Sequence, residues 1–304
     1  MRTVWLAIAA MLAAGGAQAQ PAEEAPGFEF GVRYWLSSGT TTRSHDASRF
    51  PPLANPTSTL EYDDMWANSI ELYARKTLGE KWWVKGYAGV GRINTGTFTD
   101  QDFIILNGAL FYAETVSGMD GDLKYGTIDI GREVWRRGST ALSVFAGYRQ
   151  WNEQLTAHGF TLTTGIGGSF DDSVPVVAND LTWKAARLGL AATAERGRTR
   201  YAMEVALVPY ATYRNEDSHF LRQSPNDLGP VPNVIAEGRG TGFQFDLEVR
   251  RVYPQLWDLE FGLGIRWWKL ASTHGTQTQA GTDFPLTELK SERLGGLFTV
   301  GKSW

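Results

Sequence analysis

The chain has 304 residues, no cysteine and a net charge of −4, with acidic and basic residues interspersed. The lack of cysteine excludes disulfides and thiol chemistry, and the lack of a basic tract argues against nucleic-acid binding. Twelve Trp, eleven Tyr and fifteen Phe are many for a chain that, beyond its first residues, has no apolar run long enough for a transmembrane helix. A transmembrane barrel reconciles these facts, because its strands alternate lipid-facing apolar residues with lumen-facing polar ones.

The first residues have the pattern of a secretory signal peptide. Arg2 precedes an apolar run, and Ala17-Gln18-Ala19 has the small-x-small form of a cleavage site. We therefore expect residues 1–19 to be a signal peptide and residues 20–27 a short linker. Residues 28–304 are expected to form one barrel domain.

Strand signals begin directly after the linker. Residues 28–36 alternate between two faces, which predicts a strand, and the polar stretch that follows to Ser58 predicts a loop. Residues 65–77 and 82–93 flank the short turn Leu78-Gly79-Glu80-Lys81 and predict a hairpin.

The same construction recurs along the chain at nearly even spacing. Further short turns start at residues 136, 195 and 253, and a last alternating run covers residues 294–304. Four short turns and two terminal strands predict ten strands. The intervening connections are long and polar, and they cover Asn94–Asp122, Glu153–Asp180, Arg214–Thr241 and Ala271–Ser291. This is the topology of an all-β, ten-stranded antiparallel transmembrane barrel with short periplasmic turns and long extracellular loops.

Charged residues recur on the faces that such strands turn inward. Because a ten-stranded lumen is too narrow for an open pore, we expect these side chains to pair with one another and with water, which makes a small channel the weakest functional hypothesis. They are Arg33, Glu71, Arg75, Asp129, Glu133, Glu204, Asp246, Glu248, Arg250, Glu260, Arg266 and Arg293.

Two short motifs have the composition of a hydrolytic site. Asp217 and His219 stand two residues apart, as do Asp100 and Asp102, and side chains at this spacing on extended backbone point the same way. A carboxylate beside an imidazole can act as a general base when further groups position a water. Each motif alone is more often solvated surface, and the other three histidines, at 45, 158 and 274, are predicted to be surface residues.

Strand parity raises a geometric difficulty for this site. Parity carried forward from Val90 and from Leu207 points both acidic motifs to the lipid side. Bulges would turn them inward, and Thr95-Gly96 and Pro209 are the expected places for them.

With these elements placed, the chain resembles the omptins, outer-membrane endopeptidases built on a ten-stranded barrel that stands well above the membrane. The resemblance is carried by residues 60–103, which end in Thr-Asp-Gln-Asp-Phe where omptins show Asp-Gln-Asp-Trp. It continues through residues 123–160, with Phe145-Ala146-Gly147-Tyr148, and residues 186–219. It implies a fold in which the two motifs face each other across the barrel mouth and activate a water without a covalent intermediate.

The resemblance assigns roles residue by residue. Asp217 would orient His219, which with Asp100 would deprotonate the water, while Asp102 would support Asp100; no metal is required. Omptins cut beside basic residues because acidic groups line their specificity pocket. Here Arg43 and Asn215 stand at the matching substrate-binding positions, so we expect a different preference.

The family also requires lipopolysaccharide, which binds the outer barrel face. Tyr148 matches the tyrosine of that site, whereas Gln150, Asn152 and Glu195 stand where charged partners are usual. Because the tyrosine is retained at Tyr148, we expect lipopolysaccharide as the lipid partner.

The sequence therefore predicts an omptin-like endopeptidase in the outer membrane of a Gram-negative bacterium, with its site facing the cell exterior. Its partners would be surface-accessible proteins or peptides as substrates and outer-membrane lipid, and we expect a monomer. The alternative is an omptin-like barrel without protease activity that serves as an adhesin, a binding protein or a structural protein.

Overall fold

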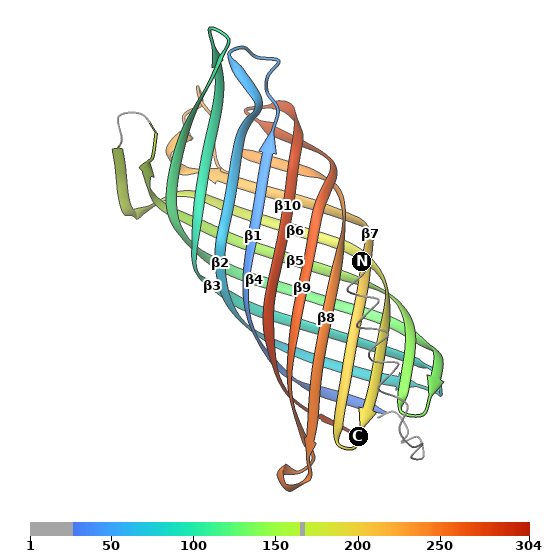
Figure 1. Cartoon of the computed structure of the whole chain (residues 1–304). Coiled ribbons are helices and arrows are strands. Elements are labelled where there is room, and N and C mark those ends of the chain that lie inside the picture. The colour runs from blue at the N-terminus through green and yellow to red at the C-terminus, as the bar shows by residue number, and fades with distance from the viewer. Residues whose placement is uncertain (1–26, 165–167) are drawn as a thin grey trace.

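The computed structural model describes residues 27–164 and 168–304. In these ranges ten antiparallel strands form a closed barrel, in which consecutive strands pair and β1 also pairs with β10 (Figure 1). The strands are β1 Phe28–His45, β2 Leu53–Leu78, β3 Trp82–Leu106, β4 Ala109–Arg137, β5 Thr140–Leu162, β6 Gly168–Arg196, β7 Thr199–His219, β8 Val234–Tyr253, β9 Leu259–Gln279 and β10 Thr282–Ser303. The predicted ten-stranded barrel is confirmed.

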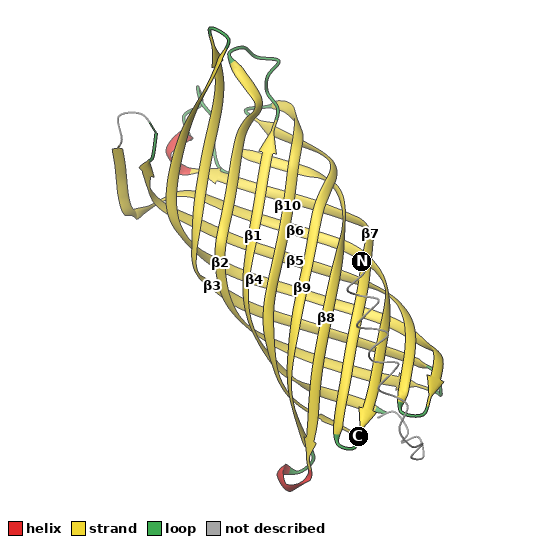
Figure 2. Cartoon of the chain, viewed as in Figure 1, coloured by secondary structure: helices red, strands yellow, loops and turns green. Residues whose placement is uncertain are grey.

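Two 3₁₀ turns, η2 Phe220–Arg222 and η3 Pro254–Leu256, are drawn as short helices in Figure 2. Within the described ranges no helix is long and apolar enough to cross a membrane. The predicted signal peptide, residues 1–19, lies outside the described residues, as does the predicted linker except for Gly27.

All four predicted short turns are present, at the barrel end that also holds the C-terminus (Figure 1). Gly79, Gly138 and Gly197 occupy three of these turns with φ of 63°, 57° and 58°. This left-handed conformation strains side chains that carry a Cβ and suits glycine, which is why a glycine marks each of these reversals.

At the opposite end, the connections predicted as loops are mostly strand. Residues 94–122 form a long hairpin around Asn107-Gly108, and residues 271–291 form one around Ala280-Gly281. The first expected loop is shortened because β1 continues to His45. Threonine-rich polar segments form paired β-strands readily. Above the lipid, neither face of such a strand has to be apolar, so the alternation of apolar and polar residues that marks a strand in the sequence is lost.

A band of exposed apolar side chains surrounds the middle of the barrel. Tyr34 pairs in register with Ile70 of β2 and Phe298 of β10, and Ile70 pairs in turn with Val90 of β3. All four are at least two-fifths exposed, as expected for a lipid-facing surface. The band therefore marks the membrane-spanning part of the barrel, and the barrel continues beyond it toward the long hairpins.

Aromatic side chains fill part of the lumen. Trp35, Trp151, Trp183 and Trp268 are each at most 1% exposed, and the rings of Trp151 and Trp268 lie 4.7 Å apart between centroids. The lumen is thus a packed core at this level.

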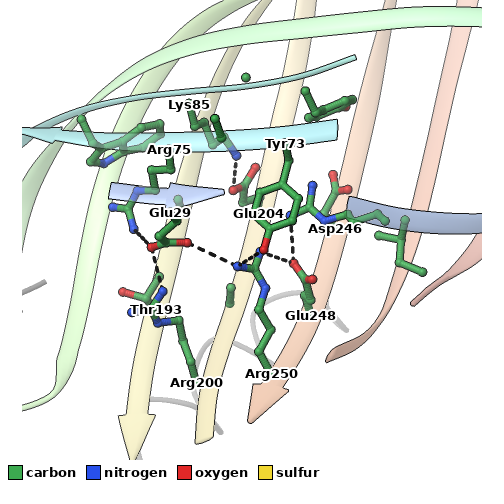
Figure 3. Close-up of a pocket in the computed structure, with 18 of the residues that line it drawn as sticks. Glu29, Tyr73, Arg75, Lys85, Thr193, Arg200, Glu204, Asp246, Glu248 and Arg250 are labelled. Carbon is green, nitrogen blue, oxygen red and sulfur yellow. Dashed lines mark hydrogen bonds and ion pairs between the residues drawn. The ribbon is translucent and has the colours of Figure 1, made fainter. Parts of the chain in front are cut away.

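Toward the end with the short turns, ion pairs between charged side chains fill the lumen (Figure 3). Glu71 accepts hydrogen bonds from Arg33 at 2.8 Å and from Arg266 at 2.6 Å, while Glu248 accepts from Arg33 at 3.1 Å and from Arg250 at 2.7 Å. The cavity left among these groups measures about 90 Å³. The expected pairing of inward charges is confirmed for this cluster.

Candidate functional site

Two bulges turn the acidic motifs into the barrel. The β3–β4 register shifts between Ile93 and Gly96, and the β7–β8 register shifts between Val208 and Ala211. Inward residues lie at odd positions of β3 up to Ile93 and at even positions from Phe98. The shifts lie where the sequence placed them, and they remove the parity difficulty.

Three of the four predicted catalytic residues line one cavity. Asp100 and Asp102 reach it from β3, and His219 reaches it from the end of β7. The cavity measures about 270 Å³ and lies beyond the lipid-facing band, at the end with the long hairpins. Asp102 is exposed at its rim, whereas Asp100 is partly buried.

The fourth residue, Asp217, lies behind the cavity with no exposed surface. Its Oδ1 accepts hydrogen bonds from the side-chain amides of Asn179 and, at 3.3 Å, Asn215. Its Oδ2 forms a close ion pair with Nη2 of Arg43. Nε2 of His219 lies 3.9 Å from the same Oδ2, which is too far for a hydrogen bond. Arg43 therefore holds the carboxylate oxygen that is nearest to the imidazole.

The two predicted substrate-binding residues meet beside this carboxylate. Nη1 of Arg43 lies 3.4 Å from Oδ1 of Asn215, and both side chains are almost fully buried. Arg43 lines the cavity, whereas Asn215 lies behind it. Of the two residues, Arg43 makes the closer contact with Asp217.

Burial shapes the acid–base properties of the cavity acids. Burial, and to a smaller extent the neighbouring Asp102 carboxylate, raise the pKa of Asp100 to about 7. Oδ1 of Asp100 is buried without a hydrogen-bond partner among the described residues. A carboxyl group with such a pKa exchanges its proton near neutral pH, and its unpaired oxygen is a suitable acceptor for a water.

His219 is held so that its ring faces the same space. Its backbone N–H donates to Oδ1 of Asn233 at 3.0 Å, and its carbonyl accepts from Nδ2 of Asn233 at 3.3 Å. Burial lowers the pKa of His219; Asp217 opposes this effect, and the Arg43 and Arg222 charges add to it. The imidazole is therefore neutral at neutral pH and able to accept a proton.

The structure adds two basic residues that the sequence did not assign to the site. His45, predicted to be a surface residue, is 8% exposed and lines the cavity, because β1 continues through the expected loop. Burial and the Arg43 charge lower the pKa of His45 to about 4. Arg222 lines the cavity from η2, where Asp227 accepts a hydrogen bond from its Nη2 at 2.8 Å. No local motif marks either residue.

The predicted lipid contact, Tyr148, lies on the outer face of β5 and is 43% exposed. On the same face, Lys184 of β6 pairs in register with Gln150. Glu195 cannot belong to this group, because it lies at the end of β6 beside the short β6–β7 turn and pairs with Arg200. The sequence alignment was wrong at this position.

The comparisons with known proteins concern the fold. No protein-family model matches the chain, and no curated protein matches it. The structure is similar to the outer membrane protease OmpT from Escherichia coli, with a TM-score of 0.75 over 91% of this chain and 96% of that chain, at 12% identity.

More distant structures include the translocator domain of the autotransporter NalP from Neisseria meningitidis, with a TM-score of 0.39 at 9% identity over 100% of this chain and 95% of that one. The Pseudomonas putida toluene transporter TodX gives 0.30 at 9% identity over 92% and 91%. The chain therefore shares the ten-stranded barrel fold of OmpT, and at this identity the likeness extends to the fold alone.

Proposed function

We propose that this chain is an omptin-type endopeptidase that hydrolyses peptide bonds with a water held between Asp100 and His219. The observation that carries the proposal is the shared cavity, which receives Asp100 and Asp102 from β3 and His219 from β7. The bulge on each strand allows the two motifs to face the same cavity. Without its bulge, either strand would point its motif at the lipid side.

The chemistry follows from the protonation states of the cavity groups. An ionised Asp100 accepts a hydrogen bond from the water, and neutral His219 takes the proton as the water oxygen attacks the peptide carbonyl. The imidazolium then returns this proton to the leaving amine. Asp102 shares the charge of the acid pair, and no step requires a metal or a covalent intermediate.

The proposed location is the outer membrane, with the cavity on the exterior. The lipid-facing band and the likeness to an outer-membrane barrel support this location. On the outer face, Tyr148 and Lys184 would contact lipopolysaccharide, because a lysine beside an aromatic ring suits an anionic lipid head group. The closed ring of strands has no free edge for a second copy to pair with, which favours a monomer.

A peptide-cleavage assay tests the proposal. The full chain, refolded in detergent with lipopolysaccharide, is expected to cleave members of a quenched fluorescent peptide library. Asp100→Asn and His219→Gln should each lower the rate by about 10²–10⁴, as removal of a general base does. Asp122→Asn is the matched control, because Asp122 is an exposed carboxylate on the outer face of β4. Cleavage that survives both cavity substitutions would overturn the mechanism.

One observation favours the non-proteolytic alternative, a barrel that binds peptides without hydrolysing them. Arg43 occupies the oxygen of Asp217 that a catalytic imidazole would use. If wild type and Arg43→Gln both bind peptides and neither cleaves them, the binding protein is the better description.

A further inference from the structure

The contact between Arg43 and Asp217 bears on which substrates the cavity accepts. Arg43 forms an ion pair with Oδ2 of Asp217, and the imidazole of His219 lies 3.9 Å from the same oxygen without a hydrogen bond to it. Asp217 is fixed independently, because Asn179 and Asn215 both donate to its other oxygen. If Arg43 moved away, Asp217 would stay in place and its Oδ2 would become available to the imidazole.

Arg43 is also accessible to a guest in the cavity, since its side chain forms part of the lining. Arg222 lines the same space and supplies a second guanidinium, whereas His45, with a pKa of about 4, is a neutral imidazole there. Among the described residues, the acids in this lining are Asp100 and Asp102. The cavity therefore offers an entering carboxylate two guanidinium partners, Arg43 and Arg222.

We propose that Arg43 is a latch released by an acidic substrate: the carboxylate of an Asp or Glu side chain in the bound peptide takes the guanidinium of Arg43 from Asp217, and Asp217 then accepts a hydrogen bond from His219. The exchange replaces one carboxylate by another, so Arg43 is never left as an unpaired buried charge. The catalytic consequence rests on the proposed hydrolysis, whereas the binding of acidic peptides does not.

The latch predicts a substrate class. Peptides with Asp or Glu near the scissile bond would both bind and activate the site, because they open the latch. A Lys or Arg at that place would be repelled by Arg43 and would leave Asp217 occupied. Arg43 thus acts as a specificity-determining and positioning residue.

The first test compares three peptides that differ only by Glu, Gln or Lys at one position of a cleaved library member. Wild type should favour Glu over Gln by at least about tenfold in kcat/KM, the size expected of one charge-assisted contact. Arg43→Gln should bring this ratio close to one, because no guanidinium at position 43 then remains to meet the Glu carboxylate. Arg43→Lys should restore part of the preference.

Arg92→Gln is the matched control, since Arg92 is an exposed arginine on the outer face of β3 and should leave the ratio unchanged. Equal rates of wild type on the Glu and Gln peptides would overturn the latch and leave the endopeptidase proposal standing. A parallel loss of both rates in Arg43→Gln, with the ratio kept, would also overturn it, because that result indicates a purely structural arginine.

The second test does not depend on cleavage. In full-chain Asp100→Asn, the imidazole of His219 is titrated by NMR, with His219→Gln identifying its signals. The Glu peptide should raise the pKa of His219, because opening the latch moves the Arg43 charge away from the imidazole and makes Asp217 its hydrogen-bond acceptor. The Gln peptide should leave this pKa unchanged. The charges of Arg222, Asp102 and Asp227 stay in place with both peptides. A pKa that the Glu peptide leaves unmoved overturns the latch. The expected shift, together with a wild-type chain that cleaves no peptide, supports the latch and overturns the proposed hydrolysis.

Discussion

Replacement of Asp100 by Asn is expected to lower the cleavage rate by about 10²–10⁴ and at the same time to stabilise the barrel above pH 7. The pKa of Asp100 is raised from 3.8 to about 7 in the folded chain. The folded state therefore binds this proton more tightly than the unfolded state does. The free energy of unfolding falls as the pH rises from about 4 to 7, because the native site opposes an ionisation that the unfolded chain permits.

The magnitude follows from the size of the shift. About three pH units correspond to about 4 kcal/mol, since each unit is worth about 1.4 kcal/mol. This is an upper bound, because Asp102 titrates together with Asp100 and shares the effect. A neutral amide at position 100 removes the ionisation, so the advantage of Asp100→Asn over wild type should grow with pH and level off above pH 7.

Guanidinium unfolding of the full chain in lipid vesicles between pH 4 and 8 measures this difference. Asp122→Asn, the exposed control, should follow wild type at every pH. In parallel, the cleavage rate of wild type should rise with pH around a midpoint near 7, because Asp100 must be ionised to hold the water. If wild type and Asp100→Asn lose stability with pH at the same rate, Asp100 is not the buried acid described here and the reasoning fails.

Three further outcomes follow from the barrel. Glu71→Gln should lower the free energy of unfolding by about 3–5 kcal/mol, because it breaks buried pairs with Arg33 and Arg266; an unchanged guanidinium midpoint would contradict this. In planar bilayers the wild-type chain should show no unitary conductance, because tryptophans such as Trp151 close the lumen, and steady single-channel steps would refute that. Lys184→Gln should weaken lipopolysaccharide binding by about 1 kcal/mol in a vesicle-partition assay, and equal binding would exclude the proposed contact.

The sequence predicts the membrane part of the barrel well because lipid imposes a local rule. A strand with lipid on one side and a filled lumen on the other must alternate, and a tight reversal needs a residue such as Gly79 or Gly138 that tolerates positive φ. Beyond the lipid, the strands are not required to alternate apolar and polar residues. The hairpin around Ala280-Gly281 is held by the same ladder hydrogen bonds, but its polar side chains give no alternation to read.

The candidate site also has parts that local sequence predicts and parts that it does not. Each acidic motif is local, and Pro209 and Thr95-Gly96 are local signals for the bulges that orient the two motifs. The contact of Arg43 with Asp217 joins residues 174 positions apart across the barrel mouth, and no pattern in either segment indicates it. The same holds for His45, whose burial follows from the continuation of a strand that polar composition hides.

The packed lumen is also what gives the cavity its chemistry. Tyr62 and Phe98 pack with ring centroids 4.8 Å apart, and the Tyr62 hydroxyl is close enough to Asp217 and Asp100 for both charges to act on its pKa. Phe98 lies two residues before Asp100 on the same inward face of β3, and burial in this packed part of the barrel raises the pKa of the carboxyl group. The raised pKa of Asp100, which in the proposed hydrolysis sets the pH at which this carboxylate can hold the water, depends on a closed lumen. An open pore at this level would hydrate the carboxylate and return it to an ordinary acid.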